Sequence, residues 1–353
     1  MENDQIELSF LSIFTLVTFF IFLLISKYSY KFKKGILLDQ DFSKPQAFHQ
    51  SAISRSGGLA GVISLNFFFV IYYLIYSNFF FEYLIVCNLM FFIGFLDDIR
   101  TKISPSKRLI LMIVFLFVSI QFLPIRISNI DIPILTTFMN NAFFSSIFIL
   151  LCFLFIINGA NLIDGFNGLL AINLIIINSI LIYINIDEGN NEFSVFLVGQ
   201  LIILLSFLLF NFPNSKIFFG DSGSYLMGGL VALNSIITNN LNPNYSSFFF
   251  CILLFYLFFE VFFSFIRKVF QKKSPVHPDG EHLHMLVFKK ISQKYGKHKA
   301  NYMNSIIINL VYFVSIFPTL YFAKDPIVSR YWFFSLIVIY LLIYYRLYRL
   351  TKN

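Results

Sequence analysis

Four short polar clusters that could do chemistry interrupt an otherwise apolar sequence. They carry carboxylates, amides and imidazoles: Asp97 and Asp98; Asn158, Asn161, Asp164 and Asn167; Asp221; and His282 with His284. Four carboxylates brought together repel one another unless a cation lies among them. Oxygen ligands without cysteine suit Mg²⁺, with Mn²⁺ as the alternative. A hard cation beside basic residues indicates phosphoryl-group chemistry, in which the protein positions oxygens and neutralises developing charge.

Each cluster also has a purely structural explanation. Adjacent Asp97 and Asp98 could be a solvated helix end, because neighbouring helical residues point about 100° apart. Asp221 could be the N-cap of the helix that follows it. The stretch Asn158 to Gly168, NGANLIDGFNG, could be a plain polar turn, and the histidines could lie on a surface loop. Glu260, inside an apolar run, could reach the surface or pair with a neighbour.

The apolar runs must position these clusters. The chain has 353 residues, 58% of them hydrophobic, and a mean hydropathy of +0.77. Its apolar runs extend for about twenty residues without alternation, which predicts an all-α polytopic integral membrane protein. Eleven transmembrane helices are expected, at roughly 8–26, 57–77, 79–96, 107–124, 142–160, 166–186, 193–212, 222–238, 247–266, 303–323 and 329–346.

The distribution of basic residues predicts the orientation. An N-terminus outside and a C-terminus inside leave only Arg126, Lys324 and Arg330 outside, as the positive-inside rule requires. All four polar clusters then share the cytoplasmic face with a large loop at 267–302. The net charge of +8 there favours anionic membrane lipids and phosphorylated substrates, and nucleic acid is not implied.

In these motifs the sequence resembles the polyprenyl-phosphate N-acetylhexosamine-1-phosphate transferases, glycosyltransferase family 4. The resemblance runs from about Ser54 to His284 and includes RSGGL from Arg55 to Leu59. It implies a single transmembrane transferase domain spanning residues 1–353 in a bacterial cytoplasmic membrane, with the active site facing the cytoplasm. The implied reaction transfers a sugar-1-phosphate from a UDP-N-acetylhexosamine to undecaprenyl phosphate and releases UMP. A homodimer is a further expectation from the family.

The resemblance also implies roles for individual residues. Asp97 and Asp98 match paired aspartates that handle the lipid phosphate, and Asp221 matches the aspartate associated with Mg²⁺. Asp164 is expected at both the catalytic and the metal site. The expected substrate-binding residues are Arg55, Asn158, Asn161, Asn167, His282 and His284.

Three departures from the family pattern shape the expected function. Asn167 stands where relatives often carry a second acid, Met285 stands where they carry a further histidine, and an arginine often found before the histidines is absent. The missing run of three histidines favours a GlcNAc-1-phosphate transferase that starts O-antigen or other surface-glycan assembly over the peptidoglycan translocase. The alternatives are a transporter or lipid flippase for an anionic substrate, whose acids should lie near the bilayer midplane, and an inactive family member.

Overall fold

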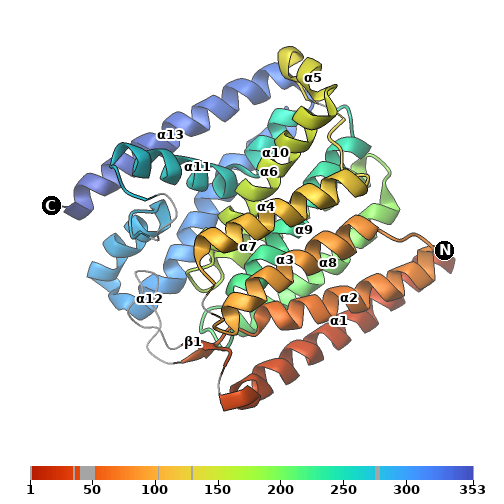
Figure 1. The fold of residues 1–353 in the computed structure, drawn as a ribbon, viewed down its shortest axis with the longest axis horizontal. Helices are drawn as coiled ribbons and strands as arrows, with labels where there is room; N and C mark the ends of the chain where they lie inside the picture. Colours follow the sequence, from red (N-terminus) through yellow and green to blue (C-terminus); the bar gives the residue numbers. More distant parts are fainter. Residues whose placement is uncertain are drawn as a thin grey trace.

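The fold is a bundle of helices of unequal length (Figure 1), described by a computed structural model for residues 2–34, 36–39, 52–101, 103–128, 130–274 and 279–352. The helices are α1 (Glu2–Tyr28), α2 (Gly57–Tyr76), α3 (Phe81–Asp98), α4 (Pro105–Phe122), α5 (Pro133–Met139), α6 (Ala142–Ile163), α7 (Leu169–Asp187), α8 (Asn191–Asn211), α9 (Gly220–Leu241), α10 (Ser247–Leu253), α11 (Phe255–Phe270), α12 (Leu283–Ile316) and α13 (Pro326–Lys352). Two 3₁₀ helices, η1 (Ser29–Lys34) and η2 (Phe317–Tyr321), and two short strands, β1 (Leu38–Asp39) and β2 (Ile53–Ser54), complete the described elements.

Eight helices in the described residues are long and apolar enough to cross a membrane: α1, α2, α4, α6, α7, α8, α12 and α13. They correspond to eight of the eleven predicted spans, and the all-helical polytopic architecture is confirmed. The predicted span 247–266 is instead two helices, α10 and α11, bent by 76° at Leu254. That pair raises the count to nine if it forms one broken span. The count of eleven and the orientation therefore remain predictions.

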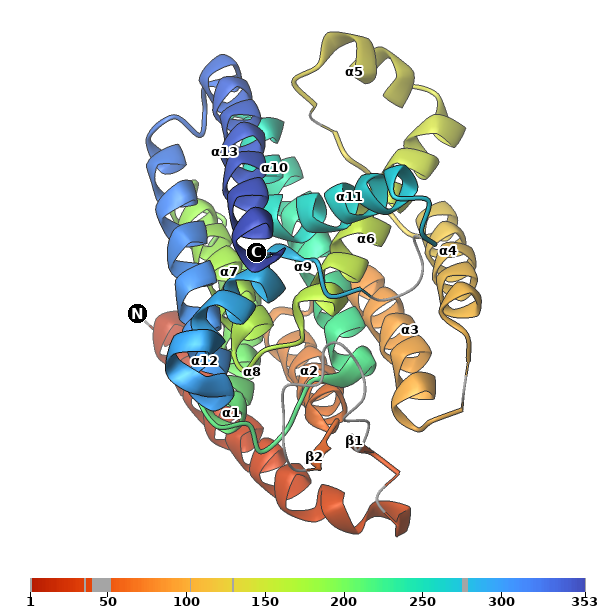
Figure 2. The ribbon, with the colours of Figure 1, turned by 90° about the vertical axis from the view of Figure 1, so that its left-hand side faces the viewer.

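The other two predicted spans form α3 and α9, which fall outside the eight. Helix α3 carries three acidic residues, Glu82, Asp97 and Asp98, and α9 carries Asp221 with several serines, asparagines and glycines. Helix α9 lies inside the bundle, packed against α2, α3, α6 and α7 (Figure 2). Most of its residues are buried by other helices. A helix surrounded by protein needs less apolar surface than one that faces lipid, so α9 can carry the polar groups of a site.

Buried amides tie α9 to its neighbours. Asn234 donates to the side-chain oxygens of Asn178 on α7 at 2.9 Å and Gln200 on α8 at 2.6 Å. It accepts a hydrogen bond from the hydroxyl of Tyr83 on α3 at 2.8 Å. Hydrogen bonds between apolar helices fix which faces meet, because a polar group left without a partner would be costly. These contacts hold α3 and α9 in the register that brings Asp98 to Asp221.

Candidate active site

The C-terminal end of α3 meets the N-terminal end of α9 through Asp98. The Asp98 side chain is only 2% exposed, and its two oxygens accept hydrogen bonds from the backbone amides of Asp221 at 3.0 Å and Ser222 at 2.9 Å. Gly94 allows this approach, because an added Cβ would overlap the Asp221 carbonyl group. Helix α9 begins at Gly220, so Asp221 lies within its first turn, and the alternative that Asp221 is the N-cap is wrong. Asp98 instead caps the free amides at this helix end.

Arg108 on α4 lies between two of the predicted acids. One guanidinium nitrogen, Nη1, lies 3.1 Å from Asp97 Oδ2 and also contacts Asp221 Oδ2. Asp97 and Asp98 therefore face different partners, as expected for adjacent helical residues. Arg108 was not among the predicted site residues. Its available signal was a basic residue in the first turn of the helix that follows the paired aspartates.

Arg55 approaches the same cluster from the segment before α2. It donates to Asp39 at 2.8 Å, and its Nη1 lies 3.7 Å from Asp98 Oδ1. Strand β2 pairs with β1, and the backbone of Gly57 and Gly58 donates to the carbonyls of residues 218 and 219 at 2.9 and 3.0 Å. The RSGGL motif is thus fixed against the residues that precede Asp221. This anchoring places the Arg55 guanidinium beside the acidic cluster.

The stretch from Asn158 to Gly168 supplies one direct contact with this cluster. The Asn161 amide donates to Asp221 Oδ1 at 3.1 Å and to Ser224 Oγ at 3.0 Å. Asn158 instead donates to the Leu154 carbonyl of its own helix at 2.7 Å. Asn167 donates to the Pro213 carbonyl at 2.7 Å and, through its backbone amide, to Asn301 at 2.8 Å. Asn161 therefore belongs to the acidic cluster, whereas Asn158 and Asn167 make structural contacts.

Asp164 lies at the turn after α6, where an ionised carboxylate is disfavoured. Burial raises the pKa of its carboxyl well above the ordinary value, and the charges of Asp221 and Asp98 raise that pKa further. Arg55 acts in the opposite direction. A divalent cation at this place would favour the ionised form, because the charge of a bound ion dominates its surroundings.

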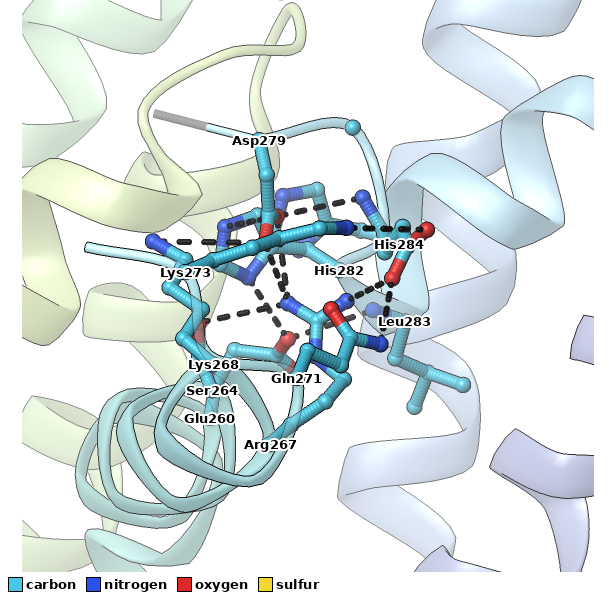
Figure 3. Close-up of polar contacts among 12 residues, drawn as sticks. Glu260, Ser264, Arg267, Lys268, Gln271, Lys273, Asp279, His282, Leu283 and His284 are labelled. Carbon is cyan, nitrogen blue, oxygen red and sulfur yellow. Dashed lines mark hydrogen bonds and ion pairs between the residues drawn. The ribbon is translucent and has the colours of Figure 1, made fainter. Parts of the chain in front are cut away.

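The two predicted histidines lie in a second, buried network between α11 and α12 (Figure 3). His282 contacts Glu260 and Asp279, at 3.1 and 3.3 Å. Arg267 donates to Asp279 at 2.8 Å and to Glu281 at 2.8 Å. Although burial alone would raise the pKa of Asp279, His282 and Arg267 together lower it below its ordinary value. The explanation that the histidines lie on a surface loop is wrong, since His282 and His284 are 2% and 0% exposed.

Glu260, for which the sequence left two structural possibilities open, also belongs to this second network. It is buried on α11, and it pairs with a neighbour, one of the two possibilities left open. Phe166, in the turn after α6, contacts this network, because its ring lies 5.8 Å from that of His284. The 158–168 stretch therefore contacts both networks.

The first cluster contains carboxylate oxygens, the kind of ligand that Mg²⁺ prefers. Asp97 and Asp221 direct one carboxylate oxygen each towards the point held by Arg108 Nη1. Within the described ranges no group of three acidic, His or Cys side chains converges as a complete metal site. Two carboxylates are nevertheless sufficient for an ion that keeps several waters and completes its coordination with substrate phosphates. A site that also contains Arg108 and Arg55 suits an anionic, phosphorylated ligand.

Comparison with known proteins agrees with the motifs. Residues 80–239 match the family model of glycosyl transferase family 4. An undecaprenyl-phosphate alpha-N-acetylglucosaminyl 1-phosphate transferase of Thermotoga maritima is 26% identical over 281 residues, which cover 79% of this chain and 81% of that protein. Phospho-N-acetylmuramoyl-pentapeptide-transferases of Clostridium perfringens and Clostridioides difficile are 32% and 30% identical, and the matches cover 41% and 53% of this chain and only 49% and 62% of those proteins. The predicted resemblance to the family is confirmed. Arg55 and the histidines lie outside the residues matched by the family model.

Proposed function

We propose that this relative of glycosyl transferase family 4 transfers an N-acetylhexosamine-1-phosphate from a UDP-sugar to undecaprenyl phosphate at the cytoplasmic membrane face and releases UMP. The observation that carries the proposal is that Asp97, Asp221, Arg108 and Asn161, from four different helices, meet in one cluster around the Asp221 carboxylate. Carboxylates for a divalent ion beside guanidinium groups for phosphates are the parts that phosphoryl transfer requires.

Different side chains of the cluster bind the metal ion, bind the phosphates and position these groups. Asp221 would hold Mg²⁺, with Asp164 nearby, and the bound ion would neutralise charge on the diphosphate. Arg108 and Arg55 bind phosphate oxygens, and Asn161 fixes the Asp221 carboxylate through its 3.1 Å hydrogen bond. Asp98 acts through position, because both of its oxygens are used by the start of α9.

The bond changes follow from this arrangement. An oxygen of the lipid phosphate attacks the sugar-bearing phosphorus, and the bond from that phosphorus to the UMP oxygen breaks. Phosphate monoesters lose their second proton near pH 6, as phosphorylated side chains do, so the nucleophile is largely ready at neutral pH. Asp97 keeps the lipid phosphate deprotonated. This role contributes less to the rate than neutralisation of the charge on the diphosphate.

The pathway is the initiation of O-antigen or another surface glycan. Support comes from the Thermotoga maritima relative, whose match covers far more of both chains than the pentapeptide-transferase matches do. Asn167, the residue that departs most from the family, has a structural contact of its own with Pro213. This hydrogen bond is a structural reason for an active enzyme to have an amide, and not a second acid, at position 167. Anionic lipids around the basic face and a homodimer complete the proposed partners.

Purified protein with undecaprenyl phosphate, Mg²⁺ and either UDP-GlcNAc or UDP-GalNAc tests the proposal through UMP release. Asp221→Asn should abolish transfer, whereas Asp97→Asn should keep residual activity that rises with pH. Equal, pH-independent losses in the two variants would refute this division of labour. No UMP release from these donors or from UDP-linked 6-deoxy amino sugars would refute the enzymatic function and favour a transporter or an inactive protein.

A further inference from the structure

The carboxylates of Asp98 and Asp221 have protein partners at all four of their oxygens. Both Asp98 oxygens accept backbone amides at the start of α9, from Asp221 at 3.0 Å and from Ser222 at 2.9 Å. Asp221 Oδ1 accepts a hydrogen bond from Asn161 at 3.1 Å, and Asp221 Oδ2 contacts Arg108 Nη1. A divalent cation can therefore bind the Asp221 carboxylate firmly only by replacing one of its two partners.

Arg108 is the partner that is held less firmly. Asn161 is fixed by a second hydrogen bond, to Ser224 Oγ at 3.0 Å, whereas Arg108 Nε is buried with no hydrogen-bond partner among the described residues. Arg108 also lies in the first turn of α4, at the end where the helix dipole disfavours a cation. The acids thus hold the guanidinium against the preference of its own helix, and its side chain is still 14% exposed.

A guanidinium and a divalent cation compete for Asp221, because both are positive and both need the same oxygen. Mg²⁺ gives up its water reluctantly and binds proteins best where substrate phosphates complete its coordination. A diphosphate shifts the competition in two ways. Its oxygens bind the cation, and they also offer the planar fork of Arg108 a two-point contact that a shared carboxylate oxygen does not provide.

We propose that Arg108 is a displaceable counter-ion, which occupies the Asp221 carboxylate and excludes divalent cations from it until the diphosphate of the nucleotide sugar binds. Arg108 then leaves Asp221 for a phosphate oxygen, so that cation and nucleotide enter the site together. Asp97 keeps the guanidinium beside the cluster during this exchange, because its Oδ2 lies 3.1 Å from the same Arg108 nitrogen. This inference rests on the proposed function and assigns its order of binding.

Binding of Mn²⁺ to the purified full-length protein without nucleotide tests the exclusion, with the paramagnetic resonance signal of free Mn²⁺ as the readout. Arg108→Gln should lower the Kd for Mn²⁺ at least about tenfold, because a unit charge beside the ion is lost. Arg55→Gln is the matched control. It removes a unit charge that lies 3.7 Å from Asp98 and should change the Kd less than about threefold. Adding Asp221→Asn to Arg108→Gln should cancel the gain, which places the ion on Asp221.

The response to nucleotide tests the displacement. The rise in melting temperature on adding UDP-GlcNAc with Mg²⁺ should be smaller in Arg108→Gln than in wild type, because the phosphates lose a guanidinium partner. Arg108→Lys keeps the charge but lacks the planar fork. It should exclude Mn²⁺ as wild type does and still show the smaller rise. A permanent ion pair between α4 and α9 would also lower stability when broken, but its loss would not tighten Mn²⁺ binding more than the Arg55 control does.

The outcomes separate this inference from the proposed function. Unchanged Mn²⁺ affinity in Arg108→Gln, or an equal gain in Arg55→Gln, would overturn the inference, while UMP release by the wild type would still support the function. If Arg108→Gln does not fold, Arg108→Met, which is also neutral, answers the same question, and loss of folding in both would show a permanent ion pair and overturn the inference. A wild-type protein that UDP-GlcNAc stabilises but that releases no UMP would refute the function, and the Mn²⁺ affinities would still decide whether Arg108 excludes the cation.

Discussion

Replacing Asp98 by asparagine should weaken the junction between α3 and α9. Each Asp98 oxygen accepts one backbone amide, from Asp221 and Ser222, and the side chain is 2% exposed. Asparagine keeps one acceptor oxygen but turns an NH₂ group towards the other amide, so one hydrogen bond to a charged group becomes a donor facing a donor. Such a bond contributes about 1.5–3 kcal/mol, and we expect Asp98→Asn to lower the free energy of unfolding by that amount.

The neighbouring charges do not cancel this loss. Removing the Asp98 charge relieves repulsion with Asp221, but it also removes the attraction of Arg55, whose Nη1 lies 3.7 Å away. Asp97→Asn is the matched control. The Asp97 side chain is 24% exposed, and its ion pair with Arg108 at 3.1 Å should contribute about 1 kcal/mol or less.

Thermal unfolding can be followed with a thiol-reactive dye. Cys87 is fully buried in α3, the helix that carries Asp98, and becomes reactive only when the bundle opens, while exposed Cys251 gives the background. A loss of about 1.5–3 kcal/mol should lower the Tm by several degrees. Equal Tm values for Asp98→Asn and wild type, or a larger drop for Asp97→Asn, would refute the assignment of Asp98 as the cap of α9.

Three further predictions concern the same site. Asn167→Asp replaces the donor to the Pro213 carbonyl with a carboxylate; stability should fall by about 1 kcal/mol and turnover should not rise, so faster transfer would contradict the structural role of the amide. Gly94→Ala should impair folding and transfer, because its Cβ would overlap the backbone of Asp221, whereas Gly165→Ala, with open space around it, should behave as wild type; equal behaviour of the two would argue against close packing of α3 on α9. Removal of divalent cations with EDTA should stop UMP release and added Mg²⁺ should restore it, and activity that persists in EDTA would count against a metal held by Asp221.

The transmembrane helices were the most predictable part of the fold. The predicted spans 142–160 and 193–212 agree with α6 (Ala142–Ile163) and α8 (Asn191–Asn211) to within a few residues. In lipid, a non-alternating uncharged run of about twenty residues can satisfy its backbone hydrogen bonds only as a helix. The bend at Leu254 was not predicted, because the residues around it are uniformly apolar and include no proline or glycine. Just after the bend, Gly159 on α6 lets the backbone of Leu257 approach closely, a long-range contact that the local sequence does not reveal.

The residues of the site were easier to predict than their partners. The motifs identified Asp97, Asp98 and Asp221 as a group, and the repulsion among them predicted a cation, which was expected to be a metal ion. The structure places the Arg108 guanidinium between Asp97 and Asp221. Local periodicity could not show that Asp98 would cap a helix starting over a hundred residues later. Likewise, Glu260 and His282 meet only because the chain turns back between α11 and α12. Such pairings depend on which helices pack together, which no short motif records.

The most direct test follows the phosphate that is transferred. In a reaction with UDP-GlcNAc labelled in the β-phosphate and undecaprenyl phosphate, the label should move with the sugar into the lipid, one for each UMP released, in wild type and not in Asp221→Asn. Label that stays in UDP would mean transfer of the sugar alone, and label released as free GlcNAc-1-phosphate would mean hydrolysis. Either result would contradict sugar-1-phosphate transfer at the site formed by α3, α4, α6 and α9.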